Sequence, residues 1–113
     1  MKAKDDRPLI GIKVVDFSQQ IAGPAVAMTM ADFGATVVRI DPPQGPSWDH
    51  DANAILQRNK HCLRLDLKTA EGLKQALELI DQADIVLESF RPGVMKRLGI
   101  DFVEIRKNKP NLI

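Results

Sequence analysis

The sequence lacks the features that would place it in several specialised classes of proteins. Cys62 is the only cysteine in 113 residues, which excludes an internal disulfide framework and fits a reducing compartment. Lys and Arg total 16 against 15 for Asp and Glu, so the net charge of +1 provides no general attraction to nucleic acid or to an anionic membrane. No apolar run approaches the roughly 20 residues that a membrane helix needs. These absences favour a cytoplasmic protein.

The length and the ends of the chain bound its domain organisation. A chain of 113 residues has room for one domain with a real core, and not for two of ordinary size. The first residues are too charged, and the apolar run after them is too short, for a signal peptide. We expect residues 1–7 to form a disordered lead. The sequence contains no internal repeat and no low-complexity segment.

A polar turn near the start of the chain separates a strand pattern from a helix pattern. Residues 9–17 are predicted to form a strand, and Pro24 is predicted to open a helix that runs to Phe33 and is capped by Gly34. Because nearly all of its residues are apolar, this helix is expected to be buried on nearly every side. Ligands of open α/β sheets bind at the carboxyl ends of strands, so the turn between strand and helix is a candidate site.

Strand and helix patterns then alternate along the rest of the chain. Strands are predicted over 35–40, 62–67 and 84–88, and helices over 70–82, 94–98 and 102–107, with Thr69 and Asp101 as caps. Residues 62–67 alternate as a strand with one solvated face. A long loop at 42–58 interrupts the alternation, and such loops are usually functional or mobile. The order predicts an α/β fold with a parallel sheet and flanking helices.

The last residues predict the beginning of a further strand. Residues 110–113 start a strand pattern that the chain does not complete. We therefore expect the chain to be the incomplete N-terminal part of a larger domain.

Two groups of residues contain the side-chain types of a metal site or of a catalytic nucleophile, but their spacing favours neither. Asp49, His50 and Asp51 are of types that bind metals, but no fourth ligand stands at a regular spacing, and a solvated loop is the simpler explanation. His61 and Cys62 are adjacent on a predicted strand, so they point to opposite faces and do not predict a catalytic dyad. We predict no metal site.

A third group imitates part of an NAD-binding fingerprint. Gly23 follows the first strand, and Asp41 ends the second, where such a fingerprint has its ribose-binding acid. The glycine-rich turn is missing, because Gly23 is alone in the segment. Asp41 more simply ends the strand and caps the loop, so NAD is not predicted.

Four short motifs occur in a defined order, at residues 16–24, 58–60, 66–68 and 88–93. With these motifs, residues 8–113 resemble the class III CoA-transferase family, which includes carnitine and formyl-CoA transferases and the 2-methylacyl-CoA racemases. The resemblance implies the N-terminal part of a large Rossmann-like domain. It also implies a homodimer in which two subunits interlock like links of a chain.

The resemblance further implies contact with coenzyme A, which serves as substrate and acyl carrier. It places the thioester end of CoA along the first turn and the nucleotide end near the exits of later strands. The implied residues are Gln20, Ile21 and Ala22 at the thioester end, Leu65 and Lys68 near the adenosine, Ser89 and Phe90 along the nucleotide, Arg97 near the phosphates, and Arg39 and Arg91 as further phosphate partners. The chain departs from common members at Ser89, where asparagine is frequent, and at Pro42, where some have arginine.

Taken one at a time, several of these residues have simpler explanations. Lys68 and Arg97 are of types that are mostly exposed, so each is also typical of a solvated surface. Phe90 could equally fill a core position. Gly23 and Pro24 could form only a helix start, because the pair is common there.

The activity that the resemblance implies is transfer of CoA from an acyl-CoA to a carboxylic acid acceptor, through an acyl-aspartate and an enzyme thioester. The aspartate that the family acylates lies beyond Ile113, so we predict no catalytic residue within the chain and expect the chain alone to be inactive. A 2-methylacyl-CoA racemase fragment and a non-catalytic module for CoA binding or oligomerisation remain the alternatives.

Overall fold

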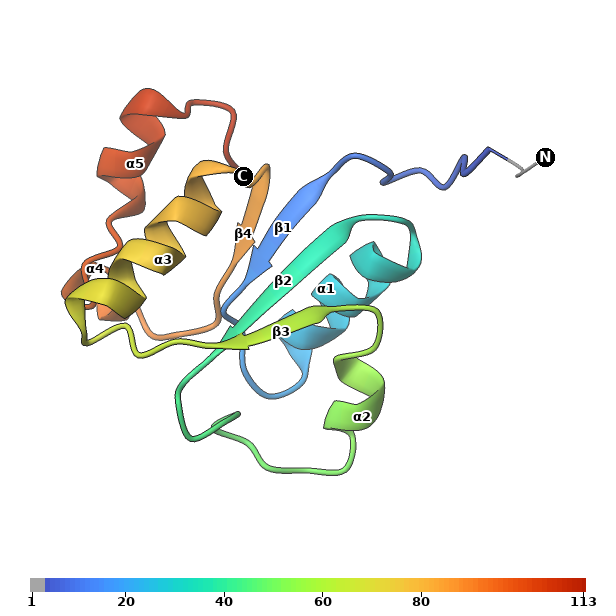
Figure 1. Ribbon diagram of the computed structural model, residues 1–113, viewed down its shortest axis with the longest axis horizontal. Coiled ribbons are helices and arrows are strands. Elements are labelled where there is room, and N and C mark those ends of the chain that lie inside the picture. The colour runs from blue at the N-terminus through green and yellow to red at the C-terminus, as the bar shows by residue number, and fades with distance from the viewer. Residues whose placement is uncertain (1–3) are drawn as a thin grey trace.

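The computed structural model describes residues 4–113 and contains, in that range, a parallel sheet of four strands (Figure 1). The strands are β1 (Lys13–Asp16), β2 (Thr36–Asp41), β3 (His61–Arg64) and β4 (Ile85–Leu87), in the spatial order β3-β2-β1-β4. The helices are α1 (Ala22–Asp32), α2 (Asn53–Leu56), α3 (Ala70–Asp81), α4 (Val94–Arg97) and α5 (Phe102–Asn108). The predicted α/β fold is confirmed.

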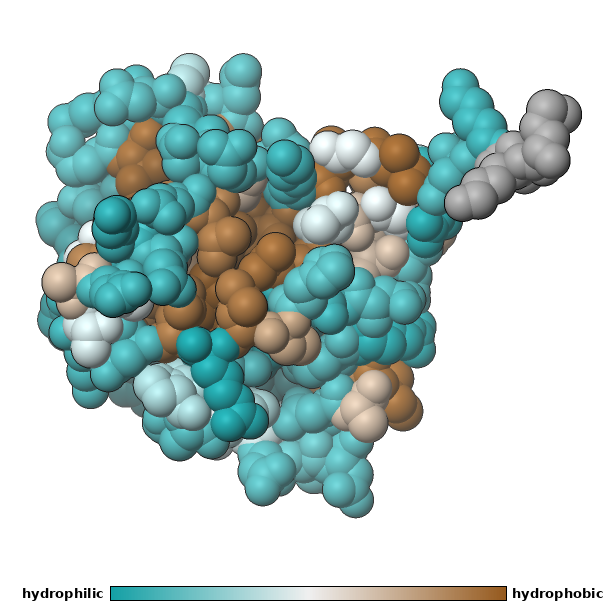
Figure 2. Space-filling model, viewed as in Figure 1, coloured by the Kyte–Doolittle hydropathy of each residue, from teal (hydrophilic) through white to brown (hydrophobic). Residues whose placement is uncertain are grey.

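Alternate side chains of the central strands pack into two separate apolar layers, as the two-residue period of a strand requires. On one face, Val14 and Val37 pack with Ala27 and Ala31 of α1. The opposite face carries the larger cluster, which joins the strands to α3 and to the C-terminal helices. Its buried members are Val15, Phe17, Ile40, Ala76, Ile80, Ala83, Met95, Ile100 and Leu112. Figure 1 shows α3, α4 and α5 gathered at the β4 side of the sheet, and Figure 2 shows a hydrophobic surface over the strands beside them.

The helix caps follow the sequence closely. The Thr69 hydroxyl oxygen accepts a hydrogen bond from the Gly72 amide at 3.1 Å, and the Asp101 carboxylate accepts one from the Val103 amide at 3.1 Å. Gly34 has a φ of +107°, a left-handed conformation that glycine adopts without steric cost. The predicted starts of α3 and α5 and the predicted end of α1 are therefore confirmed.

The prediction that the first helix is buried on nearly every side is wrong. Val26 and Phe33 are each 50% exposed, and only Pro24, Ala27 and Ala31 of α1 are buried. An 11-residue helix that lies on one face of a sheet can bury only the stripe that contacts the strands. Its start also differs, because α1 begins at Ala22, two residues before the proline.

Three further segments differ from the prediction. The loop at 42–58 contains the one-turn helix α2. The first strand is confined to Lys13–Asp16. All four residues of β3 are exposed, because this edge strand lacks the helix cover that a buried parallel strand has, so the expected single solvated face is wrong.

The two ends of the described chain are also informative. Residues 1–3 of the expected disordered lead lie outside the described residues, and in the rest of that lead Arg7 pairs with Asp5 at 2.6 Å. At the other end, the Ile113 amide donates to the Asp84 carbonyl at 3.1 Å, and the Ile113 carbonyl accepts from Val86 at 2.8 Å. This is the hydrogen-bond pattern of a parallel bridge to β4. None of the helices in residues 4–113 is long and apolar enough to span a bilayer.

Candidate functional site

A cavity of about 350 Å³ lies where the strands end. Its lining comes from the segments that follow all four strands, and in Figure 1 this is the end of the sheet near α4 and the start of α3. The lining residues are Phe17, Gln19, Ile40, Asp41, Pro42, Pro43, Gln44, Leu65, Asp66, Leu67, Lys68, Phe90 and Leu98. Loops at the carboxyl ends of a parallel sheet are the usual location of a ligand site.

A second hollow, of about 410 Å³, adjoins this cavity. It shares Leu67, Lys68 and Leu98 with the first cavity, and it adds Arg97 from α4. The structure therefore brings Leu65, Lys68, Phe90 and Arg97, four of the residues predicted to contact the nucleotide end of the ligand, into one continuous region. Phe90 also packs against the core cluster, as the simpler explanation of this residue expected.

Other predicted site residues lie elsewhere. Gln20, Ile21 and Ala22 are exposed on the turn between β1 and α1, next to the cavity residue Gln19 but outside its lining. Arg91 is exposed, and it lines neither hollow. Ser89 does not line either hollow, and its hydroxyl oxygen accepts a hydrogen bond from the main-chain amide of Gln19 at 2.9 Å.

The turn between β1 and α1 is tightly built. Gln20 has a φ of +69°, an uncommon conformation for a residue with a side chain. Gly23 lies so close to Ser18 that a Cβ at this position would overlap the Ser18 side chain. The Ser18 hydroxyl in turn donates to the Asp16 carboxylate, and so does the Ser18 amide, at 2.9 Å. The local sequence thus fixes the path by which the chain passes from strand to helix.

Buried charges lie under this turn. The Arg39 side chain is 1% exposed, and its guanidinium donates to the Ser18 carbonyl at 2.8 Å. The same guanidinium lies 3.0 Å from the Asp41 carboxylate and 3.4 Å from the Asp16 carboxylate. Lys60 also pairs with Asp16, at 3.0 Å, and both of these side chains are fully buried. Buried charges of this kind are tolerated only when they are paired and hydrogen-bonded.

Lys60 ties the loop after α2 to the start of α1. Its ammonium group donates to the Pro24 carbonyl at 3.0 Å and to the Gln57 side-chain carbonyl at 2.9 Å. Burial lowers the pKa of Lys60 below its usual value, and the negative charge of Asp16 opposes that shift. Although Cys62 is an exposed residue, partial desolvation of its sulfur raises the pKa of the thiol, and the negative charge of Asp41 adds to that shift. In the described chain, the Gln57 side-chain nitrogen is a buried donor without a partner.

The region that suggested metal ligands is organised by other contacts. His50 stacks on Trp48 with ring centroids 4.5 Å apart, and its Nδ1 accepts a hydrogen bond from the Ala52 amide at 3.0 Å. Residues 4–113 contain no group of three or more side chains placed to hold a metal ion.

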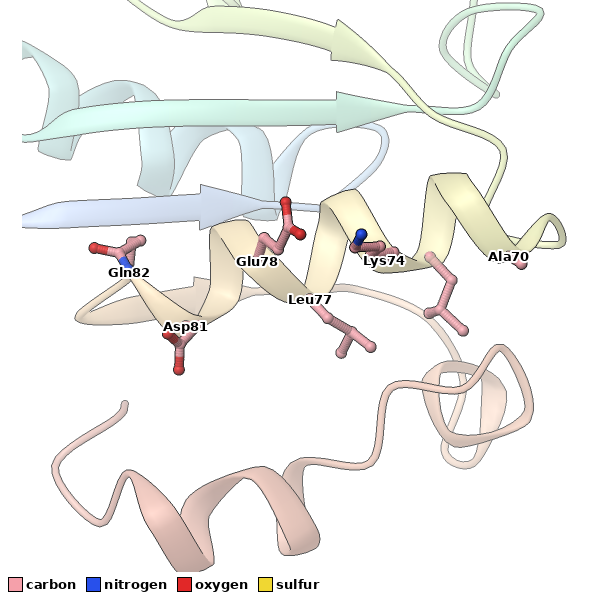
Figure 3. Close-up of a pocket in the computed structure, with 7 residues that line it drawn as sticks. Ala70, Lys74, Leu77, Glu78, Asp81 and Gln82 are labelled. Atoms are coloured by element: carbon pink, nitrogen blue, oxygen red, sulfur yellow. The ribbon is translucent and has the colours of Figure 1, made fainter.

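Another hollow, of about 530 Å³, is a groove along α3. Figure 3 shows that Leu77 and Asp81 point toward the segment containing α5, whereas Glu78 points the other way. All of its lining residues belong to α3 and the residue after it, so side chains from different elements do not converge there. The strand-end cavity is therefore the better candidate site.

The sequence model of CoA-transferase family III matches residues 9–113. The chain belongs to this family. It is 68% identical, over its whole length, to "CoA-transferase/lyase DddD" of Marinomonas sp. (strain MWYL1), of which it spans 14%. It is 38% identical to "Probable fatty acyl-CoA transferase Rv3272" of Mycobacterium tuberculosis, over 95% of this chain and 30% of that protein. The chain thus spans less than a third of the length of each of these two relatives.

Solved structures of similar proteins agree with the fold. A crystal structure of the M. tuberculosis protein superposes with a TM-score of 0.84 at 38% identity, over 95% of this chain and 32% of that one. A CAIB/BAIF family protein from Brucella suis gives a TM-score of 0.78 at 31% identity, over 88% of this chain and 30% of that one. A short-chain dehydrogenase/reductase from Serratia marcescens, at 17% identity and a TM-score of 0.51, shares the fold alone.

In this family III chain, sequence reasoning missed the buried charges. A parallel strand covered by helices is normally an apolar run, yet β2 places Arg39 and Asp41 on the same face. Asp16 is on the same face of the neighbouring strand, because it pairs in register with Arg39. The sequence signal that could have indicated these buried ion pairs was the presence of opposite charges at alternate positions of adjacent strands. Lys60, which completes the set, belongs to the motif at residues 58–60.

Proposed function

We propose that this chain is the CoA-binding part of a class III CoA-transferase, an enzyme that moves CoA between carboxylic acids. Family membership supports the reaction class, and the strand-end cavity is the observation that carries the binding role. The cavity and the adjoining hollow gather cationic, apolar and aromatic side chains from separate elements. CoA has a polyanionic nucleotide end and a partly apolar arm, so a site for it requires this mixture of side chains.

The nucleotide end of CoA suits the side of the cavity near α4. Its phosphates carry several negative charges, and Lys68 and Arg97 supply two cations along one hollow. Its adenine needs a flat apolar surface, which Leu65 and Phe90 offer in the strand-end cavity. We propose these four residues as the principal contacts of the nucleotide, with the exposed Arg91 as an outer contact for the phosphates.

The thioester end of CoA suits the turn between β1 and α1. In our proposal the pantetheine arm extends past Gln19 toward Gln20, Ile21 and Ala22, which are exposed and precede or begin α1. The first amides of a helix have no partner within the helix and can donate to a ligand. Donors fixed there would position the thioester for reaction.

Arg39 has a different role in this proposal from the one the sequence suggested. Its guanidinium is buried and donates to Asp16, Asp41 and the Ser18 carbonyl. No face of it remains for a phosphate. We propose instead that Arg39 supports the turn from below, and that Ser89 supports it through Gln19.

Calorimetric titration with CoA tests the binding role. Lys68→Met and Arg97→Met are each expected to weaken CoA binding about tenfold, because each removes a charge-assisted contact. Lys74→Met is the matched control, since Lys74 is an exposed lysine of α3 that lines neither site hollow. Equal affinities for all four proteins would contradict the proposed nucleotide site.

A transfer assay with succinyl-CoA and carboxylic acid acceptors tests the reaction class. The assay compares the 113-residue chain with the polypeptide from the complete open reading frame that encodes it. We expect turnover by the complete polypeptide and CoA binding without turnover by the chain. Turnover by the chain alone would contradict its proposed role as a binding part, and a complete polypeptide that does not bind CoA would contradict the whole proposal.

A further inference from the structure

Gln19 connects three loops at the mouth of the strand-end cavity. Its main-chain amide donates to Ser89, in the segment after β4, at 2.9 Å. Its side-chain nitrogen donates to Asp41, at the end of β2, at 3.2 Å. Its side-chain oxygen accepts from the Ser47 amide at 3.0 Å and from the Ser47 hydroxyl at 3.1 Å. One residue thus holds the exits of β1, β2 and β4 together with the long loop after β2.

The chemistry of these contacts is specific for an amide side chain. The donor end of Gln19 meets a carboxylate, and the acceptor end meets two donors of Ser47. A carboxylate at this position would repel Asp41, and an apolar side chain of the same length would satisfy neither neighbour. The Asp41 carboxylate is itself held in place, because the buried guanidinium of Arg39 lies 3.0 Å from it.

The chain of contacts runs from the rigid core outward to the cavity. Arg39 is fully enclosed, Asp41 lies at the edge of the core, Gln19 lines the cavity, and Ser47 is exposed on the loop. The residue after Gln19 has the uncommon φ of +69°. A residue in that region keeps its conformation only when its surroundings hold it, and Gln19 supplies the nearest such contacts.

We propose that Gln19 is a positioning residue, which holds the loop around Ser47 against the turn between β1 and α1 and so keeps the cavity formed before CoA arrives. The inference rests on the proposed CoA site. A cavity formed in advance avoids the cost of ordering loops on binding, so the contacts of Gln19 contribute to affinity without touching the ligand.

Two measurements on Gln19→Met test this role. Calorimetry is expected to show CoA affinity lowered about tenfold, and NMR is expected to show faster hydrogen exchange of the Ser47 amide in the absence of ligand. The matched control is Gln75→Met, because Gln75 is an exposed glutamine of α3 outside the cavity, and both quantities are expected to match the unsubstituted chain. An unchanged affinity for Gln19→Met in a chain that binds CoA would overturn the proposal.

The two readouts separate this inference from the proposed function. If the unsubstituted chain does not bind CoA, the proposed function fails. Even then, faster hydrogen exchange of the Ser47 amide in Gln19→Met than in the unsubstituted chain would support the anchoring of the loop. Unchanged Ser47 exchange would overturn the anchoring whatever the outcome with CoA. If Gln19→Met does not fold, Ser47→Ala replaces it, because this change removes only the hydroxyl contact. It is then expected to lower the affinity about threefold, and an unchanged affinity would overturn the proposal.

Discussion

The two faces of the sheet are built from the same strands, and both carry an apolar layer, but only the α1 face also holds buried charges. Phe17 and Ile40 turn toward α3 and join an apolar cluster. Their neighbours Asp16, Arg39 and Asp41 turn toward α1 and form buried ion pairs. Apolar burial is the main source of stability, whereas a buried ion pair seldom adds to it. The difference indicates that the larger apolar cluster on the α3 face contributes more to stability, and that the charges on the α1 face fix the geometry of the turn above them.

The largest effect on stability is expected from removing a buried cation on the α1 face. Arg39→Met should lower the free energy of unfolding by about 4 kcal/mol, because it leaves the Asp41 carboxylate buried without its partner. Urea unfolding of the chain measures this change. Arg64→Met is the control, since Arg64 is exposed on the edge strand β3. A loss below about 1 kcal/mol for Arg39→Met would show that the α1 face tolerates an unpaired charge and would remove the contrast between the faces.

A somewhat smaller effect is expected from opening a cavity in the apolar face. Ile80 is 1% exposed within the α3 cluster, so Ile80→Ala should lower the free energy of unfolding by about 3 kcal/mol. Val103→Ala is the matched control, because Val103 is 73% exposed. Measuring CoA affinity sharpens the comparison of the two faces. Under conditions where both variants are folded, the affinity should fall with Arg39→Met and stay unchanged with Ile80→Ala. A parallel loss of affinity in both would contradict the division of roles.

The smallest effect is expected at an ion pair outside both faces. Arg58 donates to Asp32 at 2.6 Å, and this hydrogen bond holds the pKa of the partly exposed Asp32 carboxyl below its usual 3.8. Because the folded-state pKa is depressed, the contribution of the pair is present above the unfolded pKa and is lost as pH falls through the folded pKa. NMR titration of the Asp32 carboxyl should show an upward shift in Arg58→Met. Arg106→Met, a change on α5, should leave the titration unaltered, and an unmoved Asp32 pKa in Arg58→Met would refute the assignment.

Local signals predicted most of the fold. The caps at Thr69 and Asp101 fixed the starts of two helices, because a side chain that satisfies a free amide acts within three residues. The burial of α1 was mispredicted because an apolar pattern shows which residues can be buried and not how much surface will cover them. Phe33 is apolar, and nothing in its own segment shows that it lies beyond the edge of the sheet contact.

The site was predicted less completely, because its contacts join distant segments. Arg39 meets Asp16 across 23 residues of sequence, and Lys60 meets Asp16 across 44. A charge whose partners lie so far away looks like an available phosphate ligand until the fold is known. The resemblance named Lys68 and Arg97 separately, and only the packing of α4 beside the start of α3 places them along one hollow.

The central position of β1 in the sheet also bears on the order in which the protein folds. Arg39 and Asp16, on β2 and β1, are 23 residues apart, whereas Lys13 and Asp84, which join β1 to the start of β4, are 71 apart. Closing the longer loop costs about 1 kcal/mol more in chain entropy. We therefore expect β1, α1 and β2 to associate early and β4 to dock late. The hydrogen bond between Gln19 and Ser89 would then be among the last to form, so the cavity mouth would be completed only when the sheet is.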